Sequence, residues 1–147
     1  MGRPWFILGG VSSLAVALLH LVIIFIGADA YRFFGAGEGM ATHAEQGSLI
    51  PALMTFGIVI VFVLFGLYAF SAAGLMKKLW KLKPILLAIT TIYVLRGLGF
   101  FAEILGIMYD YDVPARHAVF SFTALLIGVF HLAGLIRGWK DLSTSGT

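Results

Sequence analysis

Four long apolar runs constrain this chain more than any other feature of its sequence. They cover residues 5–28, 50–76, 85–107 and 116–136. Each is about 20 residues or longer, the length that an α-helix needs to cross a hydrocarbon core of roughly 30 Å. The composition agrees, since 61% of the residues are hydrophobic, 12% are charged and the mean hydropathy is +1.01. We therefore predict an all-α, multi-pass membrane protein, in which residues 1–147 form a single transmembrane four-helix bundle with up-down-up-down topology.

The connections between the runs leave no room for a soluble catalytic domain. The longest, residues 29–49, mixes aromatics, glycines and acids, and we expect a short helix and loop at the outer membrane surface. The chain has no cysteine, which excludes disulfide exchange and thiolate chemistry. It also lacks any recognisable nucleotide or phosphate motif. A function other than catalysis is therefore the expectation, and any chemistry would lie within the bundle or at its rim.

The basic residues are informative by position. Arg3 precedes the first run, Arg137 and Lys140 follow the last, and the second connection contains Lys77, Lys78, Lys81 and Lys83. Because cytoplasmic connections carry an excess of Lys and Arg, both termini and the second connection are predicted to be cytoplasmic. The net charge of +3 then reflects topology and not a nucleic-acid partner. We expect the lysine cluster to act as a topology signal alone; the alternative is that it also contacts anionic lipid headgroups.

The first run could instead be a cleavable signal peptide, since Arg3 precedes it and the small-residue pattern of residues 28–30 follows it. The apolar region of such peptides is only about 7–15 residues long. This run is longer, and Trp5 stands at its cytoplasmic edge. We expect it to remain as the first transmembrane helix.

The third run carries two charged residues, Arg96 and Glu103. A charge at the centre of a bilayer costs at least ~2.5 kcal/mol, so both residues need polar partners. Seven residues are about two helical turns, which places the two side chains on one face about 10 Å apart. Gly99 and Gly106 lie near that face and would let neighbouring helices approach closely. We therefore expect this face to point into protein.

Histidines extend this polar face to other helices. His20 lies on a small-residue face of the first run, and His117 and His131 share one face of the last run. Together with Arg96 and Glu103 they form a predicted buried polar line across the membrane. Glu103 and His20 differ by only about 5 Å in depth at 1.5 Å rise per residue, so we predict that they pair in the outer half of the membrane, with His117 as a further partner of Glu103.

Two segments resemble a known group of proteins. The run GLYAFSAAGLMKKLWKLKPILLAITTIYVLRGLGF at residues 66–100, with HAEQGS at residues 43–48, is similar to small four-helix proteins of the bacterial inner membrane. The resemblance implies a multi-pass protein of that membrane. It brings no activity, cofactor or site residues with it.

Two functions suit the polar line without a cofactor. Buried hydrogen bonds that hold helices in register suit an accessory or assembly subunit of a membrane complex, or a homo-oligomer, and this is the main prediction. Intramembrane Arg, Glu and His are also the groups that proton relays and substrate sites use, so the alternative is a small transporter or a proton or ion pathway.

Two further alternatives involve a cofactor, although none is predicted. A b-type haem could be held by His20 and His117, with Arg96 or Arg116 facing its propionates. A divalent metal could instead be bound near the outer leaflet. Its ligands would be His20, Glu103 and His117, with His43 or Glu45 from the first connection.

Overall fold

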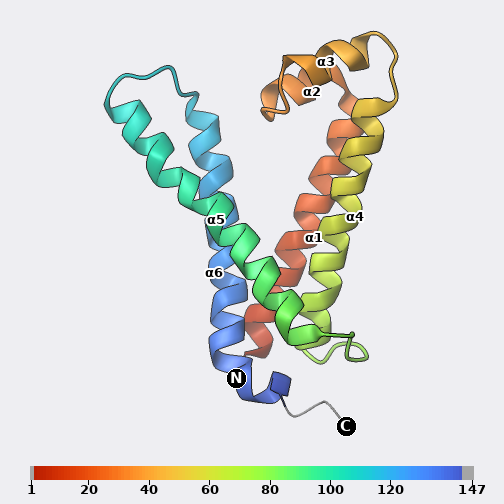
Figure 1. Ribbon diagram of the computed structural model, residues 1–147, viewed down its shortest axis with the longest axis vertical. Coiled ribbons are helices and arrows are strands. Elements are labelled where there is room, and N and C mark those ends of the chain that lie inside the picture. Colours follow the sequence, from red (N-terminus) through yellow and green to blue (C-terminus); the bar gives the residue numbers. More distant parts are fainter. Residues whose placement is uncertain (1, 144–147) are drawn as a thin grey trace. The chain divides into compact units, whose positions relative to one another are not determined.

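The computed structural model of the protein describes residues 2–143, and over these residues the chain is all-α (Figure 1). Its helices are α1 Arg3–Ile26, α2 Ala28–Phe33, α3 Glu38–Glu45, α4 Ile50–Ala72, α5 Leu82–Met108 and α6 Ala115–Ser143. Four of them, α1, α4, α5 and α6, are long and apolar enough to cross a membrane. The prediction of four membrane-length helices is therefore confirmed.

The helix ends differ from the predicted ends for reasons that lie in the backbone. α1 ends at Ile26, two residues early, because Gly27 adopts a left-handed conformation with φ 82°. α4 ends at Ala72 and not at residue 76. There Gly74 has φ 72°, its N–H bonds to the carbonyl of Ser71, and the next N–H reaches the carbonyl of Phe70. This pair of bonds is the Schellman motif, which closes a helix at a glycine.

The first connection is more ordered than the predicted helix and loop, since it forms both α2 and α3. Arg32 in α2 binds Glu38 through two nitrogens, at 3.0 Å from Nε to Oε2 and 2.6 Å from Nη2 to Oε1. Its Nη1 also donates to Glu45 Oε1 at 2.7 Å. These bonds raise the pKa of the Arg32 guanidinium and lower the pKa of both carboxyl groups. Charge pairing therefore ties the two short helices together.

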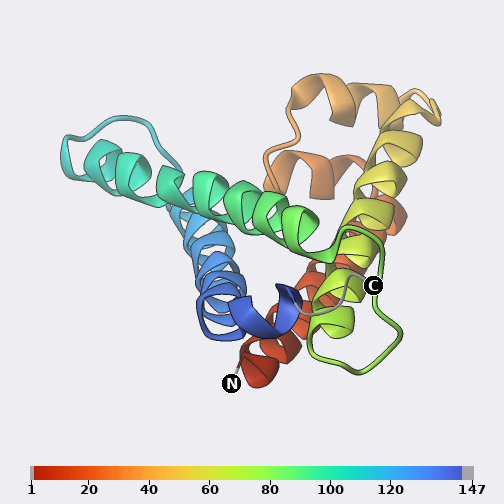
Figure 2. The same ribbon diagram turned by 60° about the horizontal axis from the view of Figure 1, so that its bottom comes forward.

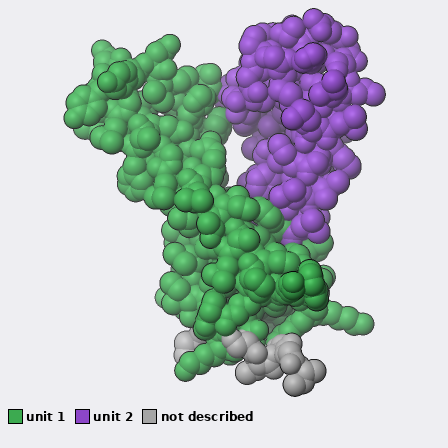
Figure 3. All heavy atoms as spheres, in the orientation of Figure 1, with its two compact units in different colours: residues 1–12, 65–147 green, residues 13–64 purple. Residues whose placement is uncertain are grey.

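The chain divides into two compact units, coloured in Figure 3. Unit 2 is residues 13–64 and unit 1 is residues 1–12 with 65–147. In unit 2, α2 and α3 pack on the end of α1 through a buried apolar cluster of Ile23, Ala30, Tyr31 and Ala41. The ring of His20 in α1 lies 5.2 Å from that of Phe62 in α4. The single transmembrane domain stays a prediction.

Unit 1 is built around the antiparallel pair of α5 and α6, joined by residues 109–114 (Figures 1 and 2). The backbones approach most closely where a Cβ on Gly97 would lie 2.5 Å from the Cα of Leu125. A second close approach places Gly128 against Val94, at 3.1 Å from an added Cβ to the backbone nitrogen. Glycine is needed at Gly97 because a side chain would overlap backbone atoms of α6, whereas at Gly128 the contact is tight and α5 would have to shift by a few tenths of an ångström.

The glycines predicted to carry this packing, Gly99 and Gly106, do not do so. A Cβ on Gly99 would be 3.5 Å from its nearest neighbour, an ordinary contact, and one on Gly106 would meet Val113 of the following connection at 2.9 Å. The buried residues of α5 in its central part are Ile89, Thr90, Tyr93 and Gly97. The helix is therefore rotated so that the row through Gly97 faces α6.

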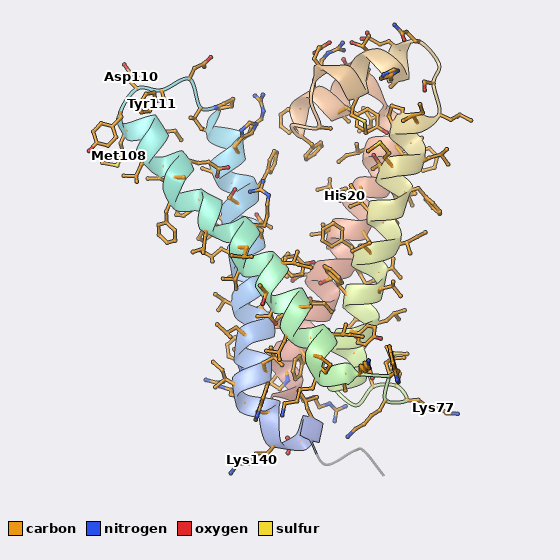
Figure 4. All side chains as sticks on the ribbon, viewed as in Figure 1. His20, Lys77, Met108, Asp110, Tyr111 and Lys140 are labelled. Atoms are coloured by element: carbon orange, nitrogen blue, oxygen red, sulfur yellow. The ribbon has the colours of Figure 1, made fainter. Side chains whose placement is uncertain are left out.

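The basic residues gather at one end of unit 1. The start of α1 packs on the end of α6, where a Cβ on Gly2 would lie 2.6 Å from the carbonyl oxygen of Gly134. Lys77 and Lys140 lie at this same end, and Asp110 lies at the opposite end (Figure 4). We call the first of these the basic end of unit 1.

Candidate functional site

Arg96, Glu103, His117 and Ser121 form what we call the polar face of unit 1. Arg96 is exposed midway along α5, and its Nη1 donates a hydrogen bond to Oγ of Ser121, a residue of α6 that is fully buried. Gly99 leaves room for these groups. A Cβ on it would lie 3.5 Å from Ser121 Oγ, 3.6 Å from Arg96 Nη1 and 3.9 Å from Glu103 Oε1. Polar atoms of three side chains therefore lie close together beside Gly99.

Glu103 is the residue of the polar face that has a buried and unsatisfied polar atom in the described part of the chain. Its side chain is half-buried, and Oε2 is inaccessible without a hydrogen-bond partner among residues 2–143. The half-buried His117 lies at the same level of the antiparallel pair, because Phe100 and Phe122 are in register with ring centroids 5.4 Å apart. A buried carboxylate oxygen without a donor is destabilising, so Oε2 of Glu103 can still accept a hydrogen bond.

His131 belongs to a different environment, the closed packing nearer the basic end. It is fully buried, and its Nδ1 donates to the carbonyl oxygen of Ile127 at 3.1 Å. Its ring lies 5.4 Å from that of Tyr93, and a Cβ on Gly9 of α1 would be 2.6 Å from the ring. Nε2 has no hydrogen-bond partner among the residues described. This histidine therefore fills the space between three helices of unit 1 and is not part of the polar face.

His20 lies in unit 2, on α1, where its Nδ1 bonds to the carbonyl oxygen of Val16 at 2.8 Å (Figure 4). Its predicted pairing with Glu103 joins residues of the two units and stays a prediction. The haem pair and the metal ligands proposed from the sequence both include His20 and likewise remain alternatives. Within residues 2–143, no three His, Asp or Glu side chains lie close enough together to hold a metal ion.

The basic end combines cations with aromatic rings. Lys83 lies 3.4 Å from the ring centre of Trp139, Lys81 lies 4.3 Å from that of Trp80, and the guanidinium carbon of Arg137 lies 4.9 Å from that of Trp5. Cations at such distances are attracted to the negative ring face. The contacts of Lys83 and Arg137 were not predicted, although Trp and cations placed at one depth are a signal of the membrane interface.

Ser121 is the functional residue that the sequence interpretation missed. It lies one helical turn after His117, on the face that was predicted to point inward. That position could have identified it as a partner for Arg96, because hydroxyl groups of this kind hydrogen-bond between transmembrane helices.

Comparison with known proteins gives no family for this chain. Family models, curated proteins and solved structures were all searched without a match. Function must therefore be argued from the polar face and the basic end alone.

Proposed function

We propose that the protein is an accessory or assembly subunit of a membrane complex in the bacterial inner membrane. In this proposal α1, α4, α5 and α6 cross the bilayer up-down-up-down, and the basic end of unit 1 is cytoplasmic with both termini. The gathering of Lys77, Lys140 and the start of α1 at one end supports this orientation. Reporter fusions at Glu38 and Asp112 should then read as external, and a cytoplasmic signal at either site would refute the topology.

The observation that carries the proposal is that Arg96, a charged residue within a membrane-length helix, is exposed. A charge at mid-bilayer costs at least ~2.5 kcal/mol, whereas a hydrogen bond between transmembrane helices averages about 0.6 and reaches about 2 kcal/mol. The bond to Ser121 therefore does not offset the cost by itself. Arg96 needs at least one further acceptor in the membrane.

A second polypeptide is the proposed source of that acceptor. Its helix would bring an oxygen acceptor to Arg96 and would remove this residue from contact with lipid. Such complementary polar groups also fix which helices associate and in what register, which is the work of an assembly subunit.

The test is the mass of the protein extracted from its own membrane in mild detergent. The native chain of 15.9 kDa should remain bound to a different polypeptide. Arg96→Leu should release that polypeptide while the variant stays folded, because the attractive contact is lost. Arg116→Leu, which removes the same charge near the start of α6, is the control and should keep the complex. Equal behaviour of the two variants would contradict the proposal.

One observation favours a second candidate, a proton-coupled carrier that acts as a single chain. Oε2 of Glu103 is buried without a donor, and such a carboxyl group can take up and release a proton in a membrane. Liposomes that contain only this protein should then show pH-driven flux that Glu103→Gln abolishes. In that case Glu103→Gln and His20→Ala should also show a coupling of about 0.5–2 kcal/mol in a double-mutant cycle, whereas additive effects would remove the predicted pair.

A further inference from the structure

A groove runs along the surface of unit 1 between α5 and α6, on the flank of α5 opposite to the polar face. Its larger part has a volume of about 690 Å³ and lies at the basic end. A second part of about 250 Å³ continues along the same two helices toward Leu95. The two parts share Leu87, Leu132 and Leu135, so they form one continuous depression. We call it the basic groove.

The inner stretch of the basic groove is apolar. Leu87 and Leu132, from α5 and α6, are 43% and 42% exposed although they line the depression, and Leu95 is 64% exposed. Thr90 is the buried polar residue here, and its hydroxyl donates to the carbonyl oxygen of Leu86 at 2.8 Å. Thr91 adds one exposed hydroxyl, and the other lining residues of this stretch are aliphatic. The stretch is therefore predominantly apolar, as the binding of an acyl chain requires.

The mouth of the basic groove is lined by charged and aromatic side chains. It is bordered by Arg137, Lys140 and Asp141 of α6, with Trp139 between them and Lys83 over the Trp139 ring at 3.4 Å. Three cations against one carboxylate leave the mouth positively charged. A tryptophan beside cations is typical of the level at which lipid headgroups lie.

We propose that the basic groove binds one anionic phospholipid. Its phosphate lies between Arg137 and Lys140, and an acyl chain follows the leucine-lined stretch toward the middle of α5. Charge complementarity selects this occupant, because an apolar helix of another protein or a zwitterionic lipid would leave the cationic mouth without a counter-charge. The site differs from the lysine cluster of the second connection, since the cations that line it, Arg137 and Lys140, belong to α6. Two lysines of that cluster reach its edge, Lys83 at the Trp139 ring and Lys78 by a 3.5 Å bond to the carbonyl oxygen of Asp141. The site also does not depend on the proposed subunit function, because no residue of the polar face lines the groove.

The test is a titration of the whole protein in mild detergent with phosphatidylglycerol or with phosphatidylcholine of the same acyl chains, read by native mass spectrometry. One phosphatidylglycerol should be retained per chain, and phosphatidylcholine should bind about tenfold more weakly or less. Lys140→Gln should raise the dissociation constant of phosphatidylglycerol about fivefold, the effect of one juxtamembrane charge. Equal retention of the two lipids by the native protein would overturn the proposal.

Two further variants distinguish binding in the basic groove from a nonspecific attraction of anionic lipid to the basic end. Lys77→Gln removes the same charge from the same end of unit 1 but lies outside the basic groove, so its effect should be less than about twofold. Losses that are equal for Lys77→Gln and Lys140→Gln would overturn the proposal in favour of a general surface charge. Leu132→Trp fills the apolar stretch and keeps every cation. It should also weaken binding, and native affinity in this variant would show that no acyl chain lies there.

Discussion

Gly97→Ala should separate α5 from α6, although it adds a single methyl group. The new Cβ would lie 2.5 Å from the Cα, 2.6 Å from the nitrogen and 2.6 Å from the Cβ of Leu125. Backbone atoms cannot rotate away, and carbon atoms pack at about 3.5–4.0 Å, so the helices would have to move apart by roughly 1 Å. Overpacking of this kind costs about 1–3 kcal/mol, more than the roughly 1 kcal/mol that alanine gains over glycine in a helix.

Gly99→Ala is the matched control, two residues further along the same helix. Its Cβ would make an ordinary contact at 3.5 Å with Ser121 Oγ, so the variant keeps the helix gain of up to ~1 kcal/mol and introduces no clash. Titration with a denaturing detergent should therefore give the highest free energy of unfolding for Gly99→Ala, then the native protein, then Gly97→Ala. The two variants should differ by about 1–3 kcal/mol, the cost of overpacking. A Gly97→Ala protein as stable as the native one, or a Gly99→Ala protein as unstable as Gly97→Ala, would refute the assigned helix face.

Two other perturbations test local packing and charge. Gly9→Ala places a methyl 2.6 Å from the buried His131 ring and should cost about 1–3 kcal/mol in the same titration, whereas Gly57→Ala, with no neighbour within 4 Å, should not be destabilising. Arg32 lowers the pKa of Glu38 and Glu45 in the folded protein. The ion pairs therefore stabilise the fold fully above the ordinary carboxyl pKa of about 4.3. This stabilisation is lost as the pH falls through the lowered pKa values. Hydrogen exchange of residues 28–45, corrected for intrinsic rates, should accelerate below about pH 4. Arg32→Gln should weaken that protection at neutral pH and flatten its pH dependence; unchanged exchange would contradict the ion-pair assignment.

The sequence predicts the number and position of the long helices well, because the length and hydropathy of each apolar run are local properties. The end of α4 was also readable, since Gly74 follows the last helical turn and supplies the left-handed residue that closes it. The break after α1 had the same kind of signal in Gly27, but it fell inside an apolar run that continued to residue 28.

The rotation of α5 was not readable from the sequence. Gly97 and Gly99 are both small and lie in one apolar run, so which of them faces α6 depends on the side chains of the partner helix, here Leu125 and Ser121. The charge cluster of the first connection could not be predicted either, because it too depends on how helices pack. Arg32 meets a carboxylate 13 residues away only because α2 and α3 fold back on each other, and no helical period encodes that contact.

A photoreactive residue at position 92 gives the most direct test of the claim that another polypeptide covers Arg96. Ile92 lies one turn before Arg96 on the same face of α5 and is 51% exposed. Leu98, 48% exposed and about 200° around the helix from Arg96, is the control position. In native membranes, position 92 should crosslink to a different protein chain, and position 98 should not. Crosslinks from position 92 that stay within this chain, or equal yields from the two positions, would contradict the subunit function.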